Sequence, residues 1–227
     1  TRPWSSAASD VYKRQGNTKQ GQLNAHWGVA RADPRTRTEL SYDGSFGYAD
    51  SEQTVNRHLG QASLKLFISR RWFFVPATSD FLSDKFQNLK FRATPAAGAG
   101  VHLFDTKKYD WDIGGATGYQ YTEFISAAAG VKNPQNDGFA SVYTYAELEF
   151  YEDVELDLEW RTNVVYTQIG LTNHVGSATF SVEITDIFDL ETTFNFYRTE
   201  NPPPRADGST PKKNDYEFIV SLALEIG

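Results

Sequence analysis

The feature that most constrains the fold is an alternation of polar and apolar residues with a period of two, which recurs along most of the chain. From Arg37 to Ser45 every odd position is polar, whereas most even positions from Leu40 to Tyr48 are apolar. This period is that of a β-strand whose two faces meet different environments. The alternation runs well beyond the ~5–6 residues typical of strands in soluble proteins. The pattern therefore predicts long amphipathic β-strands.

With weaker cases included, the alternation predicts about eleven strands. They are expected over residues 20–31, 36–48, 58–69, 71–79, 86–104, 109–123, 139–150, 154–167, 178–185, 190–198 and 215–226. Most are ten or more residues long, which fits the ~9–11 residues of a tilted transmembrane strand. No stretch approaches the ~20 consecutive apolar residues of a membrane-spanning helix. We predict an all-β, antiparallel, up-and-down transmembrane β-barrel, natively of about twelve strands, of which about eleven are present.

The expected connections alternate strictly between short and long. Tight turns are expected at residues 32–35, 70–71, 105–108, 151–153 and 186–189. Longer polar loops are expected at residues 49–56, 80–85, 125–137, 169–177 and 199–214. Bacterial outer-membrane barrels have short periplasmic turns and longer extracellular loops, whereas an immunoglobulin-like sandwich needs irregular Greek-key connections. The connections therefore support the barrel.

The N-terminal residues are expected to lie outside the barrel. By the same alternation the last strand ends in the periplasm but the first begins outside, so one strand is missing before Gly16. Residues 1–15 show no usable alternation, and we expect them to be a non-native leader before a single barrel domain at residues 16–227. The absence of a signal peptide is expected to follow from the same truncation. The predicted location is the outer membrane of a Gram-negative bacterium.

Composition excludes several other classes of protein. The net charge of −7 argues against a nucleic-acid partner, because phosphate contacts need a basic surface. The chain has no cysteine, which excludes disulfide scaffolds, thiolate zinc sites and cysteine nucleophiles. The mean hydropathy of −0.51 does not exclude a membrane location, because it averages two strand faces.

Three segments carry a family resemblance. They are Gly16-Asn17-Thr18 at the start of an amphipathic strand, residues 88–105 with their Ala-Gly-Ala-Gly core, and the Pro-rich loop 201–213 before the last strand. In these the chain resembles the YdiY-like family of salt-induced outer-membrane proteins, from about residue 16 to residue 227. The resemblance implies a roughly twelve-stranded outer-membrane barrel with no established substrate. It also implies a Trp-containing first strand before the Gly-Asn-Thr turn, which we expect this chain to lack.

The most informative polar feature is an acidic wall inside the barrel. Pairing Phe150 with Val154 across one turn sets glutamates and aspartates of neighbouring strands opposite each other. The expected pairs are Glu149 with Glu155, Glu147 with Asp157 and Glu183 with Glu191, and the wall comprises Glu147, Glu149, Glu155, Asp157, Glu159, Glu183 and Glu191.

Like charges directly opposite each other destabilise a sheet, so something must neutralise this wall. One interpretation is a set of salt bridges from basic residues across the lumen. These candidates are Arg37, Lys65, Lys90, Arg92 and Arg161, with Lys90 and Arg92 near the opposite wall. The other interpretation is passage of cations, because acidic rings select them.

Aromatic residues gather towards the strand ends. On a barrel such residues form girdles at the two membrane interfaces. The expected girdle comprises Tyr48, Trp72, Phe74, Trp111, Tyr121, Tyr166, Phe196 and Tyr216.

No pattern of catalytic, cofactor or metal-binding residues is evident. The four histidines, His26, His58, His102 and His174, lack the spacing of a metal site, and His26 and His102 are expected to face the lumen. The strand serines share the polar register, whereas a lipid-cleaving barrel needs Ser and His on the lipid face. The glycines at 114, 115 and 118 lie within an expected strand, where they admit bulky neighbours or bends. We expect no enzyme, no cofactor and no metal.

Three functional hypotheses follow. The first, which the resemblance slightly favours, is a structural, stress-associated envelope protein with a plugged lumen. The second is a small diffusion channel that prefers cations. The third, an outer-membrane lipid hydrolase, has no supporting residue constellation. Expected partners are outer-membrane lipid, lipopolysaccharide and the barrel assembly machinery, with no nucleic acid and a monomeric state.

Overall fold

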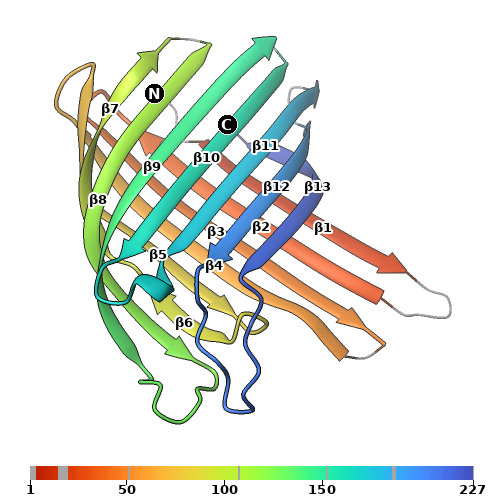
Figure 1. Ribbon diagram of the computed structural model, residues 1–227. Coiled ribbons are helices and arrows are strands. Elements are labelled where there is room, and N and C mark those ends of the chain that lie inside the picture. Colours follow the sequence, from red (N-terminus) through yellow and green to blue (C-terminus); the bar gives the residue numbers. More distant parts are fainter. Residues whose placement is uncertain are drawn as a thin grey trace.

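A computed structural model describes residues 4–14, 20–50, 52–106, 108–151, 153–185 and 188–226, with residues 4–14, 20–22 and 223–226 described as backbone only. The chain forms a cylinder of tilted antiparallel strands (Figure 1). The elements are β1 (Trp4–Arg14), β2 (Gln20–Ala32), β3 (Thr36–Ala49), β4 (Glu52–Phe67), β5 (Trp72–Asp84), β6 (Leu89–Ala93), β7 (Ala96–Asp105), β8 (Tyr109–Phe124), β9 (Gln135–Tyr151), β10 (Val154–Val165), the short 3₁₀ helix η1 (Ile169–Leu171), β11 (Asn173–Thr185), β12 (Phe188–Thr199) and β13 (Asn214–Ile226). No helix among these described residues is long and apolar enough to cross a membrane.

The strands close into an up-and-down barrel. Apart from β6 and β7, consecutive strands pair with each other, and β1 pairs with β13. Segments β6 and β7 both lie between β5 and β8, so they form one barrel strand interrupted at Thr94 and Pro95. Proline has no N–H to donate to the ladder, which accounts for a break there. The described strands therefore make a twelve-stranded antiparallel barrel, as predicted.

The two faces of the strands separate as the alternation predicts. Large apolar side chains lie on the outer surface, including Trp27 at 46% exposure and Phe218 at 68%. Polar residues such as Gln120 and Thr122 are fully buried inside. The small apolar core, formed by Leu89, Phe124, Phe139, Val165 and Leu171, lies where strands meet the connections at one end.

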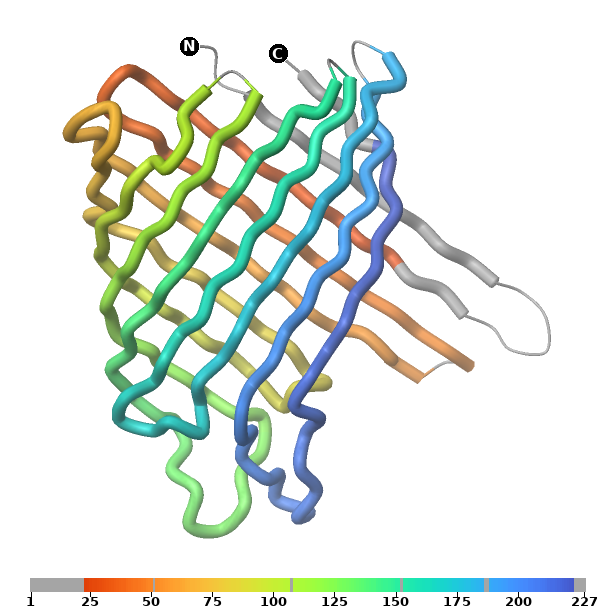
Figure 2. The backbone as a smooth tube through the Cα atoms, turned by 45° about the horizontal axis from the view of Figure 1, so that its top comes forward, coloured from red at the N-terminus to blue at the C-terminus, as the bar shows by residue number. Residues whose placement is uncertain are grey.

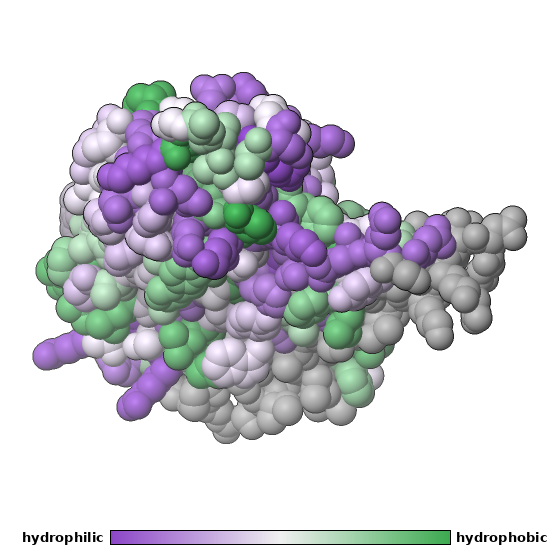
Figure 3. All heavy atoms as spheres, turned by 90° about the horizontal axis from the view of Figure 1, so that it is seen from below, coloured by the Kyte–Doolittle hydropathy of each residue, from purple (hydrophilic) through white to green (hydrophobic). Residues whose placement is uncertain are grey.

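The connections differ from the predicted strict alternation. Long connections occur at residues 125–134, 166–172 and 200–213, and we call the end that carries them the loop end (Figures 1 and 2). The opposite end, with the connections at 33–35, 68–71 and 106–108, is the turn end. The predicted loops 49–56 and 80–85 are wrong, because β4 begins at Glu52 and β5 extends to Asp84. Seen from the loop end, hydrophilic residues spread across much of the surface (Figure 3).

The N-terminal segment also differs from the prediction. Residues 4–14, expected to supply no strand, form β1, which pairs with β2 over eleven residues and with β13 over four. The strand that we expected to be missing is therefore present, and it contains a tryptophan as the family resemblance implies. The Gly16-Asn17-Thr18 segment lies outside the described residues. The hypothesis that residues 1–15 are foreign to the natural protein stays a prediction.

Candidate functional site

The candidate site is the lumen, which holds two large cavities. Their volumes are about 460 Å³ and about 350 Å³, and both are lined by His26, Gln61, Glu159 and Arg161. Because they share these residues, the two cavities adjoin one another inside the barrel. The strands that line them contribute alternate residues, which is why the polar register of the sequence faces the cavities.

The cavity lining is predominantly acidic. Among described residues, nine carboxylates and four guanidinium or ammonium groups line the two cavities. The carboxylates are Glu39, Asp43, Asp80, Glu155, Asp157, Glu159, Asp189, Glu191 and Glu217, and the basic groups are Arg37, Arg57, Lys65 and Arg161. The lumen therefore carries an excess of negative charge.

The acidic wall forms where β9 and β10 pair. Glu149 lies opposite Glu155 and Glu147 opposite Asp157, as the sequence predicts. Ligand oxygens of Glu147, Glu155 and Asp157 all lie within 4.8 Å of one another. The Tyr145 hydroxyl bridges two of them, lying 3.1 Å from Glu147 Oε2 and 3.0 Å from Asp157 Oδ1.

Part of the predicted wall has a different register. Val154 pairs with Tyr151 instead of Phe150, and a bulge after Val154 restores the expected pairing of the glutamates. On the next hairpin Glu191 lies opposite Ser181, so the predicted Glu183–Glu191 pair is wrong. Glu183 instead lies opposite Asp189 and is exposed, because the hairpin pairs Val182 with Leu190.

The predicted basic partners divide into three groups. Arg37, Lys65 and Arg161 line the lumen as expected, and each pairs with a carboxylate. The separations are 2.6 Å from Arg37 Nε to Glu39 Oε1, 3.2 Å from Lys65 Nζ to Asp112 Oδ2, and 2.7 Å from Arg161 Nη1 to Asp80 Oδ2.

The other two basic residues do not reach the acidic wall. Lys90 has a 62% exposed side chain and pairs with Glu123 at 2.7 Å, so its predicted place in the lumen is wrong. A register shift between Leu89 and Phe91 displaces it from the alternation. Arg92 lines a third, smaller cavity near the loop end.

Sequence reasoning missed an ion pair between Arg57 and Asp84. Arg57 Nη1 lies 3.2 Å from Asp84 Oδ2, and the two side chains are 9% and 4% exposed. The Arg57 guanidinium also lies 3.5 Å from the centre of the Tyr197 ring. The predicted strand 58–69 begins too late to include Arg57, and the predicted strand 71–79 ends too early to include Asp84. Continuing the alternation by a few residues would have found them.

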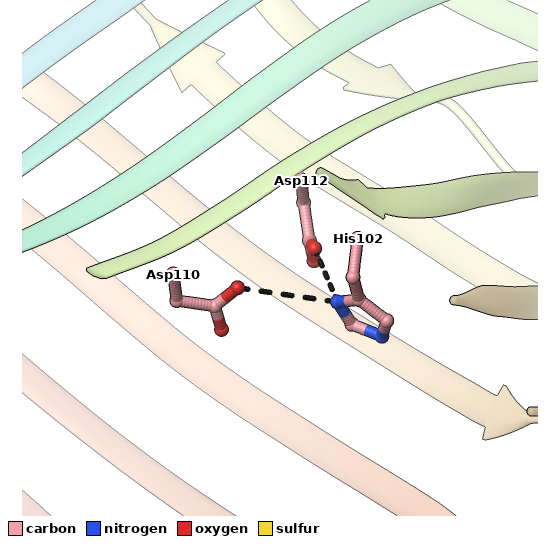
Figure 4. Close-up of side chains that lie close together, drawn as sticks. All are labelled: His102, Asp110 and Asp112. Carbon is pink, nitrogen blue, oxygen red and sulfur yellow. Dashed lines mark ion pairs between the residues drawn. The ribbon is translucent and has the colours of Figure 1, made fainter. Parts of the chain in front are cut away.

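A second missed cluster lies near the turn end, where β7 pairs with β8 (Figure 4). His102 Nδ1 lies 2.5 Å from Asp112 Oδ1 and 3.9 Å from Asp110 Oδ1, and all three side chains converge. Two ligands of one tetrahedral zinc ion, at ~2.1 Å each, would lie roughly 3 Å or more apart. Because the 2.5 Å separation is shorter and Lys65 already pairs with Asp112, these positions fit an ion-pair network better than a metal site.

The expected girdle residues lie near the strand ends. Trp72, Phe74 and Trp111 lie near the turn end, and the other five lie towards the loop end. Of the eight, six are exposed, namely Tyr48, Trp72, Phe74, Trp111, Tyr166 and Tyr216. Tyr121 and Phe196 are half-buried; the Tyr121 ring packs at a tilt against Phe91, and the Phe196 ring stacks on Trp160.

The strand glycines have the role that the sequence predicts. A side chain at Gly114 would overlap the Tyr143 ring, and one at Gly98 would overlap the backbone of Gly115. These glycines therefore allow close approach of neighbouring strands and rings.

Outside the barrel strands, three described carboxyls have lowered pKa values. Two hydrogen bonds from the Arg198 guanidinium hold the pKa of Glu200 at about 2. The hydroxyl of Thr36, together with backbone N–H groups, lowers the pKa of Asp33, and the hydroxyl and N–H of Ser209 lower that of Asp207. All three groups remain ionised at neutral pH.

Comparisons with known proteins agree with this fold. A family described as "Protein of unknown function, DUF481" matches residues 11–226. The solved structure of the NanC porin has a TM-score of 0.57 at 8% identity, over 99% of this chain and 99% of that chain. An outer membrane channel from Pseudomonas putida F1 has a TM-score of 0.52 at 12% identity, over 99% of this chain and 93% of that chain. No curated protein matches the sequence. At these identities the structural likeness concerns the fold alone.

Proposed function

Because the chain belongs to the DUF481 family of proteins of unknown function and its barrel encloses an acidic lumen, we propose that it is a narrow outer-membrane diffusion channel that favours cations. The outer membrane suits a closed barrel with an apolar outer surface, since closure leaves no backbone hydrogen-bonding group facing lipid. The lipid, the lipopolysaccharide and the barrel assembly machinery are the corresponding partners, and a monomer suffices for conduction.

The observation that carries this proposal is the acidic wall beside the 460 Å³ cavity. Glu155, Asp157 and Glu191 line that cavity, and Lys90 points elsewhere and pairs with Glu123. Salt bridges that neutralised the acidic wall would favour a closed lumen. Carboxylates that line a cavity instead favour the passage of cations.

A structural role in the envelope is the second candidate. Ion pairs cross the barrel from Lys65 on β4 to Asp112 on β8 and from Arg161 on β10 to Asp80 on β5. Such bridges narrow the lumen and stiffen the cylinder. A stress-associated barrel predicts an osmotic phenotype on deletion and no conductance.

Reversal potentials in a planar bilayer under a potassium chloride gradient test the proposal. We expect the wild type to favour potassium and the double variant Glu155→Gln/Asp157→Asn to move towards no preference. The matched control is Glu123→Gln, which removes one carboxylate outside the cavities. Preference for chloride in the wild type, or an equal shift in the control, would contradict the proposed role of the wall.

A further inference from the structure

A small pocket near the loop end of the lumen gathers arginines from four separate strands. Its volume is about 40 Å³, and its lining includes Arg57 of β4, Arg92 of β6, Arg161 of β10, and Tyr197 and Arg198 of β12. A cavity of ~10–15 Å³ by the same water-sized measure holds one water. The pocket therefore has room for a small ion or the charged end of a solute.

Three of the four arginines are paired. Arg161 contacts Asp80 at 2.7 Å, Arg57 contacts Asp84 at 3.2 Å, and Arg198 contacts Glu200 at 2.8 Å. Arg92 has no hydrogen bond or ion pair with any residue that the structure describes, and its Nε atom is buried. The charged groups close enough to influence it are Arg57, Asp84 and Asp80.

Arg92 is therefore the one arginine of this pocket that lacks an ion-pair partner among the described residues. An arginine cannot relieve this by losing its proton, because its pKa is too high. The Arg92 side chain is half-buried, and removing a charge even partly from water without a partner is unfavourable. An anion taken from solution would supply the missing partner of Arg92.

We propose that this pocket binds an oxyanion, a carboxylate or a phosphate group, with the Arg92 guanidinium as its main donor. The planar guanidinium fork matches the two oxygens of such a group. The inference rests on the proposed function, since the anion would enter through the lumen. It also extends that function, because a bound anion would make the passage more negative and strengthen its preference for cations.

The test uses the refolded full chain in detergent. The midpoint of thermal unfolding is measured against sodium acetate in one arm and sodium phosphate in the other, at constant ionic strength made up with sodium chloride. A ligand that binds only the folded state raises the midpoint in a saturable way. We expect such a rise in the wild type, and the arm with the tighter apparent dissociation constant identifies the oxyanion.

Arg92→Gln is expected to weaken the apparent affinity at least tenfold. The matched control is Lys90→Gln, which removes the same charge from the same strand outside the lumen, and it should leave the affinity unchanged. If Arg92→Gln does not fold, Arg92→Lys replaces it, with a weakened but measurable affinity expected because the charge remains without the fork.

The absence of a saturable rise in the unfolding midpoint of the wild type, or equal oxyanion affinities in the Arg92 and Lys90 variants, would contradict the proposed oxyanion site. Conductance is recorded on the same preparation. A barrel that conducts without binding oxyanions contradicts the oxyanion site alone. A barrel that binds oxyanions without conducting contradicts the proposed channel.

Discussion

The ion pair between Arg161 and Asp80 should be one of the interactions inside the lumen that contribute most to the stability of the barrel. It joins β10 to β5 across the lumen at 2.7 Å, and the side chains are 16% and 18% exposed. Asp80→Asn would leave Arg161 with only Glu159, at 3.4 Å, as an ion-pair partner among the described residues. Breaking a buried pair on one side costs about 3–5 kcal/mol, and we expect the lower end, about 3 kcal/mol, because the cavities admit water.

Urea unfolding in lipid vesicles, followed by tryptophan fluorescence, measures this cost. The double variant Asp80→Asn/Arg161→Gln removes both charges, so it should cost less than the sum of the single variants by about 1–3 kcal/mol. Because Arg161 lines all three lumen cavities, Arg161→Gln should also raise single-channel conductance. Additive single-variant costs with unchanged conductance would show that the side chains do not meet across the lumen.

Three further predictions concern the rest of the barrel. Asp112→Asn should destabilise the fold by about 3 kcal/mol in the same urea assay, because the side chain is 2% exposed and pairs with Lys65. Gly98→Ala should cost about 1–3 kcal/mol through overlap with the neighbouring backbone. Gly60→Ala should leave the stability nearly unchanged, because the nearest atom to the added Cβ would lie at 3.9 Å. Equal losses of stability in Gly98→Ala and Gly60→Ala would contradict the strand spacing. Glu200 should titrate near pH 2 by carboxyl NMR. Its lowered pKa stabilises the fold above pH ~4.5, and that contribution is lost as the pH falls through about 2. A titration midpoint near 4.5 would exclude its pairing with Arg198.

The direction in which most lumen residues face could be predicted from the sequence. Alternation within a strand is a local property, so Glu155, Asp157 and Arg161 could be placed inside from their positions alone. The predicted pairing of Glu147 with Asp157 is also correct, although the turn pairs Val154 with Tyr151 and the bulge after Val154 restores the expected register. A bulge or a displaced turn breaks this inference, as the Glu183 register shows.

Contacts across the lumen could not be predicted in the same way. Arg161 and Asp80 lie on strands far apart in the chain, and their contact depends on how the closed barrel brings opposite walls together. The ends of the strands were also difficult to predict, because in the sequence the polar residues that face the lumen resemble loop residues. For this reason Arg57 and Asp84 were missed, and with Arg57 a part of the arginine pocket.

Single-channel recording of the refolded full chain in symmetrical potassium chloride tests the central claim most directly, namely that the lumen is a passage. A heat-dependent shift in gel migration first establishes that the protein used is a folded barrel. We predict discrete conductance steps that increase in Arg161→Gln. Silence from a verified folded barrel, in both the wild type and this variant, would contradict the channel and leave the structural role.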